Sequence, residues 1–223
     1  MPTIVEQTRQ ESAKPIDLTE ETPVWRRVSP KALSIAGGAI ALIALVAWGV
    51  TVSGRRKAEF SARALDEARA VAESGNLPLA SSSLQKVIQS YGGTPAAEEA
   101  VITLNQVRLV NGQNELAAVN LREYLNGKHE PQYVAAANGL LGTALENANR
   151  PLEAAAAYRA ASDASAVDYL KADYLLDVAR ADRNGGKLAE AEAAYREVIA
   201  KYPKATSVTE AKLRLEELTA GRK

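Results

Sequence analysis

Apolar residues fall into two patterns along this chain. Between Ala32 and Gly54 no charged residue interrupts them, and the stretch begins ALSIAGGAIALIALVAWGVTV. Beyond residue 60 they recur at spacings of three and four residues, which is the period of a helix with one buried face. The first pattern predicts one continuous apolar helix, and the second predicts a series of amphipathic helices. The fold class expected from both is all-α.

The uncharged stretch has the length of a membrane-spanning helix. About 20 apolar residues, rising about 1.5 Å each, cross a hydrocarbon layer of about 30 Å. Ser29 and Pro30 supply a helix start, and Trp25 and Trp48 lie near opposite ends, where indole rings favour the membrane interface. A cleaved signal peptide has a shorter apolar region, and a buried core helix does not carry basic residues at both ends. We therefore expect a retained transmembrane helix over residues 31–54.

The polar residues before this helix predict a tail. Residues 1–30 contain few large apolar groups, which is typical of a disordered segment. Basic residues flank the apolar stretch on both sides in nearly equal number, so the positive-inside rule does not fix its orientation.

The amphipathic part of the chain repeats with a period of 37 residues. Each repeat contains a turn residue, a small residue five positions later and a large apolar residue four positions after that. The three sets are Gly75, Gly112, Asn149 and Gly186; Ala80, Ala117, Ala154 and Ala191; and Leu84, Leu121, Tyr158 and Tyr195. A period of roughly 20 to 50 residues is typical of a solenoid, in which each unit buries its apolar face only against its neighbours. The expected units lie near 61–97, 98–134, 135–171 and 172–208.

Each unit has the pattern of two helices joined by a tight turn. In the last unit Leu175 and Val178 fall at helical spacing before Asn184-Gly185-Gly186 breaks the run. The second helix ends at Tyr202-Pro203, because proline cannot continue it. Apolar residues then return at helical spacing and predict a capping helix over 207–220, which would cover the apolar face of the last unit.

These positions resemble the tetratricopeptide repeat. That repeat places Leu and Gly in its first helix, Gly at the turn, and then Ala, an aromatic residue and a closing Pro. The best matches are Leu141-Gly142, Gly186, Ala191, Tyr195 and Pro203. The first-helix aromatic is missing, and Glu67 and Arg108 occupy positions that are normally apolar. The resemblance implies a tetratricopeptide-like repeat domain over 55–223, whose opening helix, 56–73, can continue the membrane helix.

The whole layout is similar to that of the ancillary Sec translocon subunit family of bacterial inner-membrane proteins. That resemblance implies a cytoplasmic N-terminus, one span, and a periplasmic repeat domain that contacts Sec translocon subunits and periplasmic chaperones. Separately, the stretches SYGGTPAAEEA and KYPKATSVTEA resemble repeats of cell-division coordinators and outer-membrane assembly lipoproteins. Two interpretations therefore stay open: a scaffold that assists protein export or folding, and a structural adaptor for envelope assembly or cell division.

Composition and motifs argue against catalysis. The 27 basic and 27 acidic residues balance, so no overall field attracts nucleic acid, and the absence of cysteine excludes disulfides and thiolate chemistry. His129 is the single histidine, which we interpret as a solvated loop residue, and Ser81-Ser82-Ser83 has no histidine nearby to act as a base. We expect no catalytic residue, metal, cofactor or small-molecule substrate, and hence no enzyme.

The resemblance points instead to a protein-binding surface. In tetratricopeptide domains set positions of the first helices point into a concave face, although an ordinary solvated face would carry similar residues. The corresponding residues are Arg69, Glu73, Gln106, Thr143, Glu146, Asn147, Asp173, Leu176, Arg180 and Arg183. We expect Thr143, Glu146 and Asn147 to lie beside Arg180 and Arg183. We also expect that alanine at both arginines weakens partner binding and leaves melting nearly unchanged.

Overall fold

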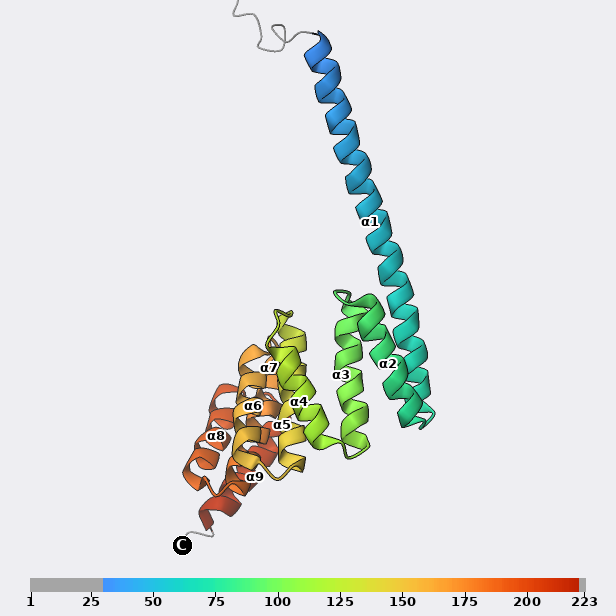
Figure 1. The fold of residues 1–223 in the computed structure, drawn as a ribbon. Helices are drawn as coiled ribbons and strands as arrows, with labels where there is room; N and C mark the ends of the chain where they lie inside the picture. The colour runs from blue at the N-terminus through green and yellow to red at the C-terminus, as the bar shows by residue number, and fades with distance from the viewer. Residues whose placement is uncertain (1–29, 221–223) are drawn as a thin grey trace, which may run out of the picture. The chain divides into compact units, whose positions relative to one another are not determined.

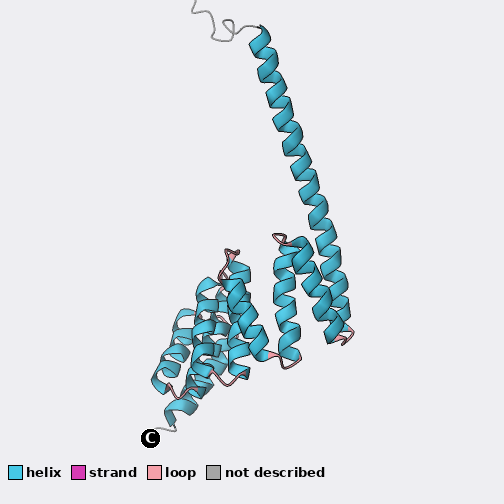
Figure 2. Cartoon of the chain, viewed as in Figure 1, coloured by secondary structure: helices cyan, strands magenta, loops and turns pink. Residues whose placement is uncertain are grey.

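The computed structural model describes residues 30–220, and within this range the chain forms nine α-helices and no strand (Figure 1, Figure 2). The predicted all-α class is thereby confirmed for these residues. The expected tail, the proposed N-cap Ser29 and Trp25 lie outside the described residues. The chain divides after Val52 into two compact units.

Helix α1 (Pro30–Glu73) is 44 residues long and has no break. The predicted span and the predicted opening helix of the first repeat are therefore parts of one helix. Large apolar side chains from Ile40 to Val50 are 60–68% exposed, so they do not contribute to a protein core. Among the described residues, α1 is the one helix long and apolar enough to cross a membrane by length and composition.

The second unit contains the end of α1 and eight shorter helices, whose starts follow from local sequence. Thr94 caps α3 by accepting a hydrogen bond from the backbone N–H of Ala97 at 3.2 Å, and proline stands at the first position of several helices, where no donor is lost. The helices are α2 (Leu77–Tyr91), α3 (Pro95–Val110), α4 (Asn114–Leu125), α5 (Pro131–Asn147), α6 (Pro151–Ala164), α7 (Asp168–Asn184), α8 (Leu188–Lys201) and α9 (Ser207–Ala220).

The 37-residue period has a direct structural meaning. The four turn residues Gly75, Gly112, Asn149 and Gly186 all adopt the left-handed conformation, with φ of 82°, 72°, 58° and 78°. This conformation suits glycine and is tolerated by asparagine. The four alanines of the second set are completely buried, and the large residues of the third set are at most 2% exposed. The period thus marks the turn, the close helix contact and the core residue of each helical hairpin.

Successive helices pack against one another in chain order, from α2 on α3 to α8 on α9, and α9 also contacts α7. The apolar core is divided into two clusters. One is formed by α1, α2 and α3 around Leu65, Leu84 and Leu104, and the other is formed by α4 to α9. Each helix therefore buries its apolar face against close neighbours in sequence, as in a helical-repeat protein.

Polar groups lie in the interior between α3 and α4. Asn105, which is fully buried, donates a hydrogen bond to Asn120 on α4 at 2.9 Å. Arg108 is only 7% exposed, and its guanidinium donates to Asn105 at 3.3 Å. Burial lowers the pKa of Arg108, because the charged form loses its hydration. By contrast, Glu67, the other departure from the repeat pattern, is exposed.

Candidate functional site

The ten residues named from the sequence all lie on the first helix of a hairpin. We call the surface that carries them the inner face; its residues are Arg69 and Glu73 on α1, Gln106 on α3, Thr143, Glu146 and Asn147 on α5, and Asp173, Leu176, Arg180 and Arg183 on α7. The structure brings some of them together in two groups, whereas Glu73, Asp173 and Leu176 make no hydrogen bond or ion pair in either group within the described range. One lies between α1, α3 and α5, and the other lies between α5 and α7.

The first group lines a shallow hollow of about 380 Å³. Its side chains come from three successive first helices: Arg69, Glu99, Ile102, Thr103, Gln106, Gln132, Tyr133 and Ala136. Arg69 donates to Glu99 at 2.8 Å, and both side chains remain about two-fifths exposed. The hollow therefore offers charges of both signs, amides and hydroxyls beside apolar groups, and it brings together the predicted residues Arg69 and Gln106.

Sequence reasoning named two of the eight residues of this hollow, Arg69 and Gln106, and missed the other six, among them Glu99, Gln132 and Tyr133. The period contained the signal for Glu99, because residue 99 lies two periods of 37 before Asp173, which was named. Gln132 and Tyr133 open α5, and no consensus position of the repeat marks them. They line the hollow because α5 begins at Pro131, which places both residues in its first turn.

The second group is a hydrogen-bond network centred on Glu146. Its carboxylate accepts bonds from Arg180 Nε at 3.2 Å and Nη2 at 2.9 Å, from the Tyr158 hydroxyl at 3.1 Å and from Asn184 at 3.3 Å. Arg180 Nη1 also donates to Asp177 at 2.6 Å. Glu146 and Arg180 therefore lie together, as expected, and tie α5 to α7.

The other residues expected in this group behave differently. The hydroxyl of Thr143 lies 3.2 Å from that of Tyr158, so it joins the network. Asn147 instead donates to Asn114 on α4 at 3.3 Å. Arg183 makes no ion pair with any residue in the described range. Of the two arginines proposed to meet a partner, only Arg183 has a charge that is not already paired in this part of the chain.

The carboxylates of Glu146 and Asp177 explain why the Arg180 side chain is fixed between α5 and α7. Burial alone would raise the pKa of Glu146, but hydrogen bonds from Arg180, Tyr158 and Asn184 outweigh it and hold that pKa below its usual value. The bond to Glu146 raises the pKa of Arg180, while burial raises the pKa of Asp177. Since Arg180 neutralises two partly buried carboxylates, we revise the expectation that its removal leaves folding unchanged.

His129 is not the solvated loop residue inferred from the sequence, so that interpretation is wrong. Its side chain is 14% exposed, and its Nδ1 lies 2.8 Å from a carboxylate oxygen of Glu98 on α3. Nε2 lies 2.7 Å from the backbone oxygen of Tyr124, and the two rings stack with centroids 3.8 Å apart. The Tyr124 hydroxyl also donates to Glu98. His129 thus fastens the α4–α5 loop to the start of α3.

Residues 30–220 contain no group of three or more side chains that could hold a metal ion. The hollows that involve the inner face are shallow, which favours contact with another chain over enclosure of a small molecule. No family model matches the chain, and no curated protein matches it. What the fold defines is the class: an all-helical, repeat-like protein with one candidate membrane-spanning helix.

Proposed function

We propose that this chain is a non-enzymatic, membrane-anchored scaffold for protein–protein interactions in the bacterial envelope. Its repeat domain is of the tetratricopeptide type, and it assists the Sec translocon and periplasmic chaperones in protein export or folding. The observation that carries the proposal is the inner-face hollow, which extends over α1, α3 and α5 and mixes ionic, amide and apolar groups.

The arrangement of the hairpins supports a tetratricopeptide-type solenoid. Gly142 on α5 lies so close to α6 that an added Cβ would come within 2.5 Å of the Tyr158 ring. Ala154 on α6 is likewise fully buried. Small residues at both positions let paired helices approach closely, which is the role of the small residues in that repeat. A solenoid of this kind presents an extended binding surface without needing a deep pocket.

The chemistry of the hollow suits an extended polypeptide. A peptide backbone offers alternating donors and acceptors, which the amides of Gln106 and Gln132 can satisfy from adjacent helices. Ile102 and the ring of Tyr133 supply apolar contact area beside them. Aromatic residues and arginine are enriched in protein interfaces, and Arg69 and Tyr133 are both present here.

Partner binding is tested by purifying the full chain from gently solubilised membranes. The double variant Gln106→Ala/Tyr133→Ala removes two contacts from the hollow. The control Gln85→Ala/Gln89→Ala alters exposed residues of α2 outside it. We expect Sec translocon subunits to copurify with the native chain and the control, and to be depleted from the hollow variant. Equal depletion from both variants, or copurification of division or assembly proteins instead, would contradict the proposal.

The proposed topology puts the N-terminus in the cytoplasm and the repeat domain in the periplasm. Because the chain has no cysteine, single cysteines at Ser12 and Ser90 can be probed separately with a membrane-impermeant thiol reagent in cells with a permeabilised outer membrane. Ser90 is exposed on α2, so it should react. Labelling of Ser12→Cys without labelling of Ser90→Cys would reverse the topology.

A further inference from the structure

Both ring nitrogens of His129 face hydrogen-bond acceptors. Nδ1 lies 2.8 Å from a carboxylate oxygen of Glu98, and Nε2 lies 2.7 Å from the backbone oxygen of Tyr124. A neutral imidazole has one N–H and one lone pair, so it donates to one acceptor and turns its lone pair toward the other. Imidazolium has two N–H groups. The geometry around His129 therefore suits the charged ring, which donates to both oxygens.

The ring of His129 is enclosed by its neighbours. The Tyr124 ring stacks against it, and Gly127 lies so close to Nε2 that an added Cβ would clash with the ring. Because the His129 side chain is only 14% exposed, water is a poor substitute for a lost hydrogen bond. Loss of one proton therefore leaves a lone pair facing an oxygen at hydrogen-bond distance, and that contact becomes unfavourable.

The other charged and titratable groups in this cluster keep their state near neutral pH. They come from every element packed against His129: Glu98 on α3, Tyr124 on α4, Lys128 and Glu130 in the α4–α5 loop, and Tyr133 on α5. Burial raises the pKa of Tyr124, and the bond to Glu98 raises it further; burial also raises the pKa of Tyr133. Imidazole is the side chain that ordinarily titrates between about pH 5 and 8. A change of pH in that range therefore acts on this cluster through His129.

His129 is also connected to the inner-face hollow. It stands two residues before Pro131, where α5 begins. Gln132 and Tyr133 follow in the first turn of α5 and line the inner-face hollow. Tyr133 also lines the hollow of about 550 Å³ that contains His129 itself. The loop that His129 fastens thus leads directly into two side chains of the candidate binding surface.

We propose that the contact of His129 with Glu98 and Tyr124, which we call the latch, is a pH-sensitive device that sets the shape of the inner-face hollow. Below about pH 6 the charged ring holds the α4–α5 loop against α3. As the pH rises toward about 8 the ring loses a proton, the latch opens, and the first turn of α5 shifts with Tyr133. The stabilisation from the latch is therefore present in mild acid and lost as the pH rises. The proposal rests on the proposed function, because it gives that binding surface a regulated state.

The latch is tested by nuclear magnetic resonance of the full chain in detergent micelles. Because His129 is the single histidine, isotope-labelled histidine gives imidazole signals from this residue alone. Both ring nitrogens should be protonated at about pH 6, and one should lose its proton by about pH 8. The ring signals of isotope-labelled Tyr133 should move with the same midpoint. A neutral ring at about pH 6, or fixed Tyr133 signals while the ring titrates, would overturn the proposal.

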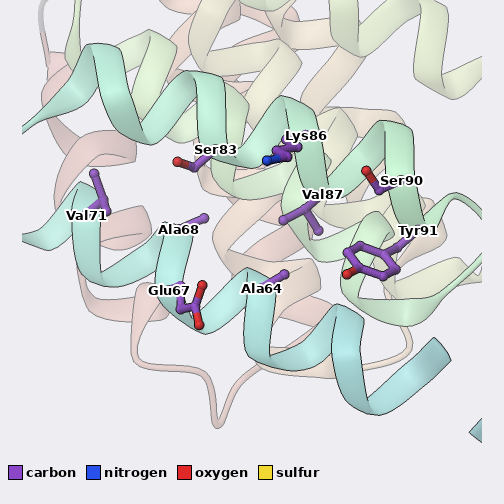
Figure 3. Close-up of a pocket in the computed structure, with 9 residues that line it drawn as sticks. All are labelled: Ala64, Glu67, Ala68, Val71, Ser83, Lys86, Val87, Ser90 and Tyr91. Atoms are coloured by element: carbon purple, nitrogen blue, oxygen red, sulfur yellow. The ribbon is translucent and has the colours of Figure 1, made fainter. Parts of the chain in front are cut away.

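The same tyrosine-labelled sample contains an internal control. Tyr91 lines a separate hollow of about 370 Å³ between α1 and α2, whose charged groups are Glu67 and Lys86 (Figure 3). Carboxyl and ammonium groups do not ordinarily titrate between about pH 6 and 8. The Tyr91 signals should therefore stay constant over that range. Equal movement of the Tyr91 and Tyr133 signals would show a general effect of pH and would contradict the latch.

Two substitutions assign the effect to the ring. His129→Gln keeps a donor but does not titrate, so the Tyr133 signals should become independent of pH. The matched control is Lys128→Gln, which removes a charge from an exposed position of the same loop and should keep the native pH dependence. Persistence of the pH dependence in His129→Gln, or its loss in both variants, would contradict the assignment to His129.

Copurification at two pH values separates this proposal from the proposed function. The native chain should retain severalfold more Sec translocon subunits at about pH 6 than at about pH 8, and His129→Gln should show no such difference. Equal recovery from the native chain at both values would overturn the regulation. Absence of these subunits at both values, together with a coupled titration of His129 and Tyr133, would contradict the proposed function and support the latch.

Discussion

Removing Arg180 should destabilise the fold, because its side chain ties α7 to α5. Arg180→Ala deletes two bonds to Glu146 and one to Asp177, and leaves both carboxylates without their cation. A hydrogen bond to a charged group contributes about 1.5–3 kcal/mol when buried, and an exposed ion pair contributes about 0.2–1 kcal/mol. The Arg180 side chain is 43% exposed and that of Glu146 is 20% exposed, so the site lies between these limits. We therefore expect Arg180→Ala to lower the free energy of unfolding by about 1–2 kcal/mol.

The matched control is Arg183→Ala, one turn further along α7. Arg183 forms no ion pair in the described range, so its removal should change the free energy of unfolding by less than about 0.5 kcal/mol. Thermal unfolding of the full chain, followed by circular dichroism, should show a midpoint lowered by roughly 2–8 °C for Arg180→Ala alone. Identical melting of the two variants would refute the assignment of Arg180 as a tie between helices.

Acid should reduce the difference in stability between the native chain and Arg180→Ala. Because the pKa of Glu146 is lowered in the folded state, its contribution is present above the unfolded pKa and is lost as the pH falls through the folded one. Burial raises the pKa of Asp177 while Arg180 lowers it, so without Arg180 that pKa is raised further and protonation in acid stabilises Arg180→Ala more than the native chain. Both effects narrow the gap between the native chain and Arg180→Ala below about pH 4. A gap that widened in acid would contradict the network.

Three further substitutions test the packing, each by urea unfolding of the full chain. Gly142→Ala places a Cβ within 2.5 Å of the Tyr158 ring. The overpacking should lower the free energy of unfolding by about 1–3 kcal/mol, which exceeds the gain of about 1 kcal/mol from the better helix propensity of alanine. Unchanged stability would show that the Tyr158 ring moves aside without cost. Leu84→Ala should cost about 2–5 kcal/mol because Leu84 is fully buried, whereas Leu79→Ala, 49% exposed in the same helix, should cost less than about 1 kcal/mol; equal costs would contradict the core. Arg108→Met should stabilise by about 1 kcal/mol, since a buried cation without a carboxylate is removed; a loss would show that its bond to Asn105 is needed.

Local signals predicted most of the fold. Gly75, Gly112, Asn149 and Gly186 marked the turns, because a left-handed residue between two helices leaves a clear trace in sequence. The apolar run without charges marked the candidate span, and this run lies within α1. The sequence left the continuity of α1 open, because no proline or glycine between residues 55 and 73 forces a break and nothing in that stretch requires the two predicted helices to be one.

The site was only partly predictable, because its pairings connect residues far apart in sequence. Glu146 and Arg180 are 34 residues apart, nearly one period, so the repeat itself placed them on neighbouring first helices. The contact between His129 and the carboxylate of Glu98 was not predicted, because Glu98 lies 31 residues earlier and no position of the repeat links the two. The buried hydrogen bond between Asn105 and Asn120 also has no local signal, because a buried asparagine looks like a solvated one in the sequence until its partner is placed.

The most direct test of the central claim is site-specific photo-crosslinking in living cells. A photoreactive amino acid at Gln106 lies in the inner-face hollow, whereas the same residue at Gln89 lies on the exposed side of α2. We predict discrete adducts with Sec translocon subunits or periplasmic chaperones from position 106, and few or none from position 89. Adducts from position 89 alone, or no adduct with a protein of either kind from position 106, would contradict the claim that the inner face is a binding surface for the export machinery.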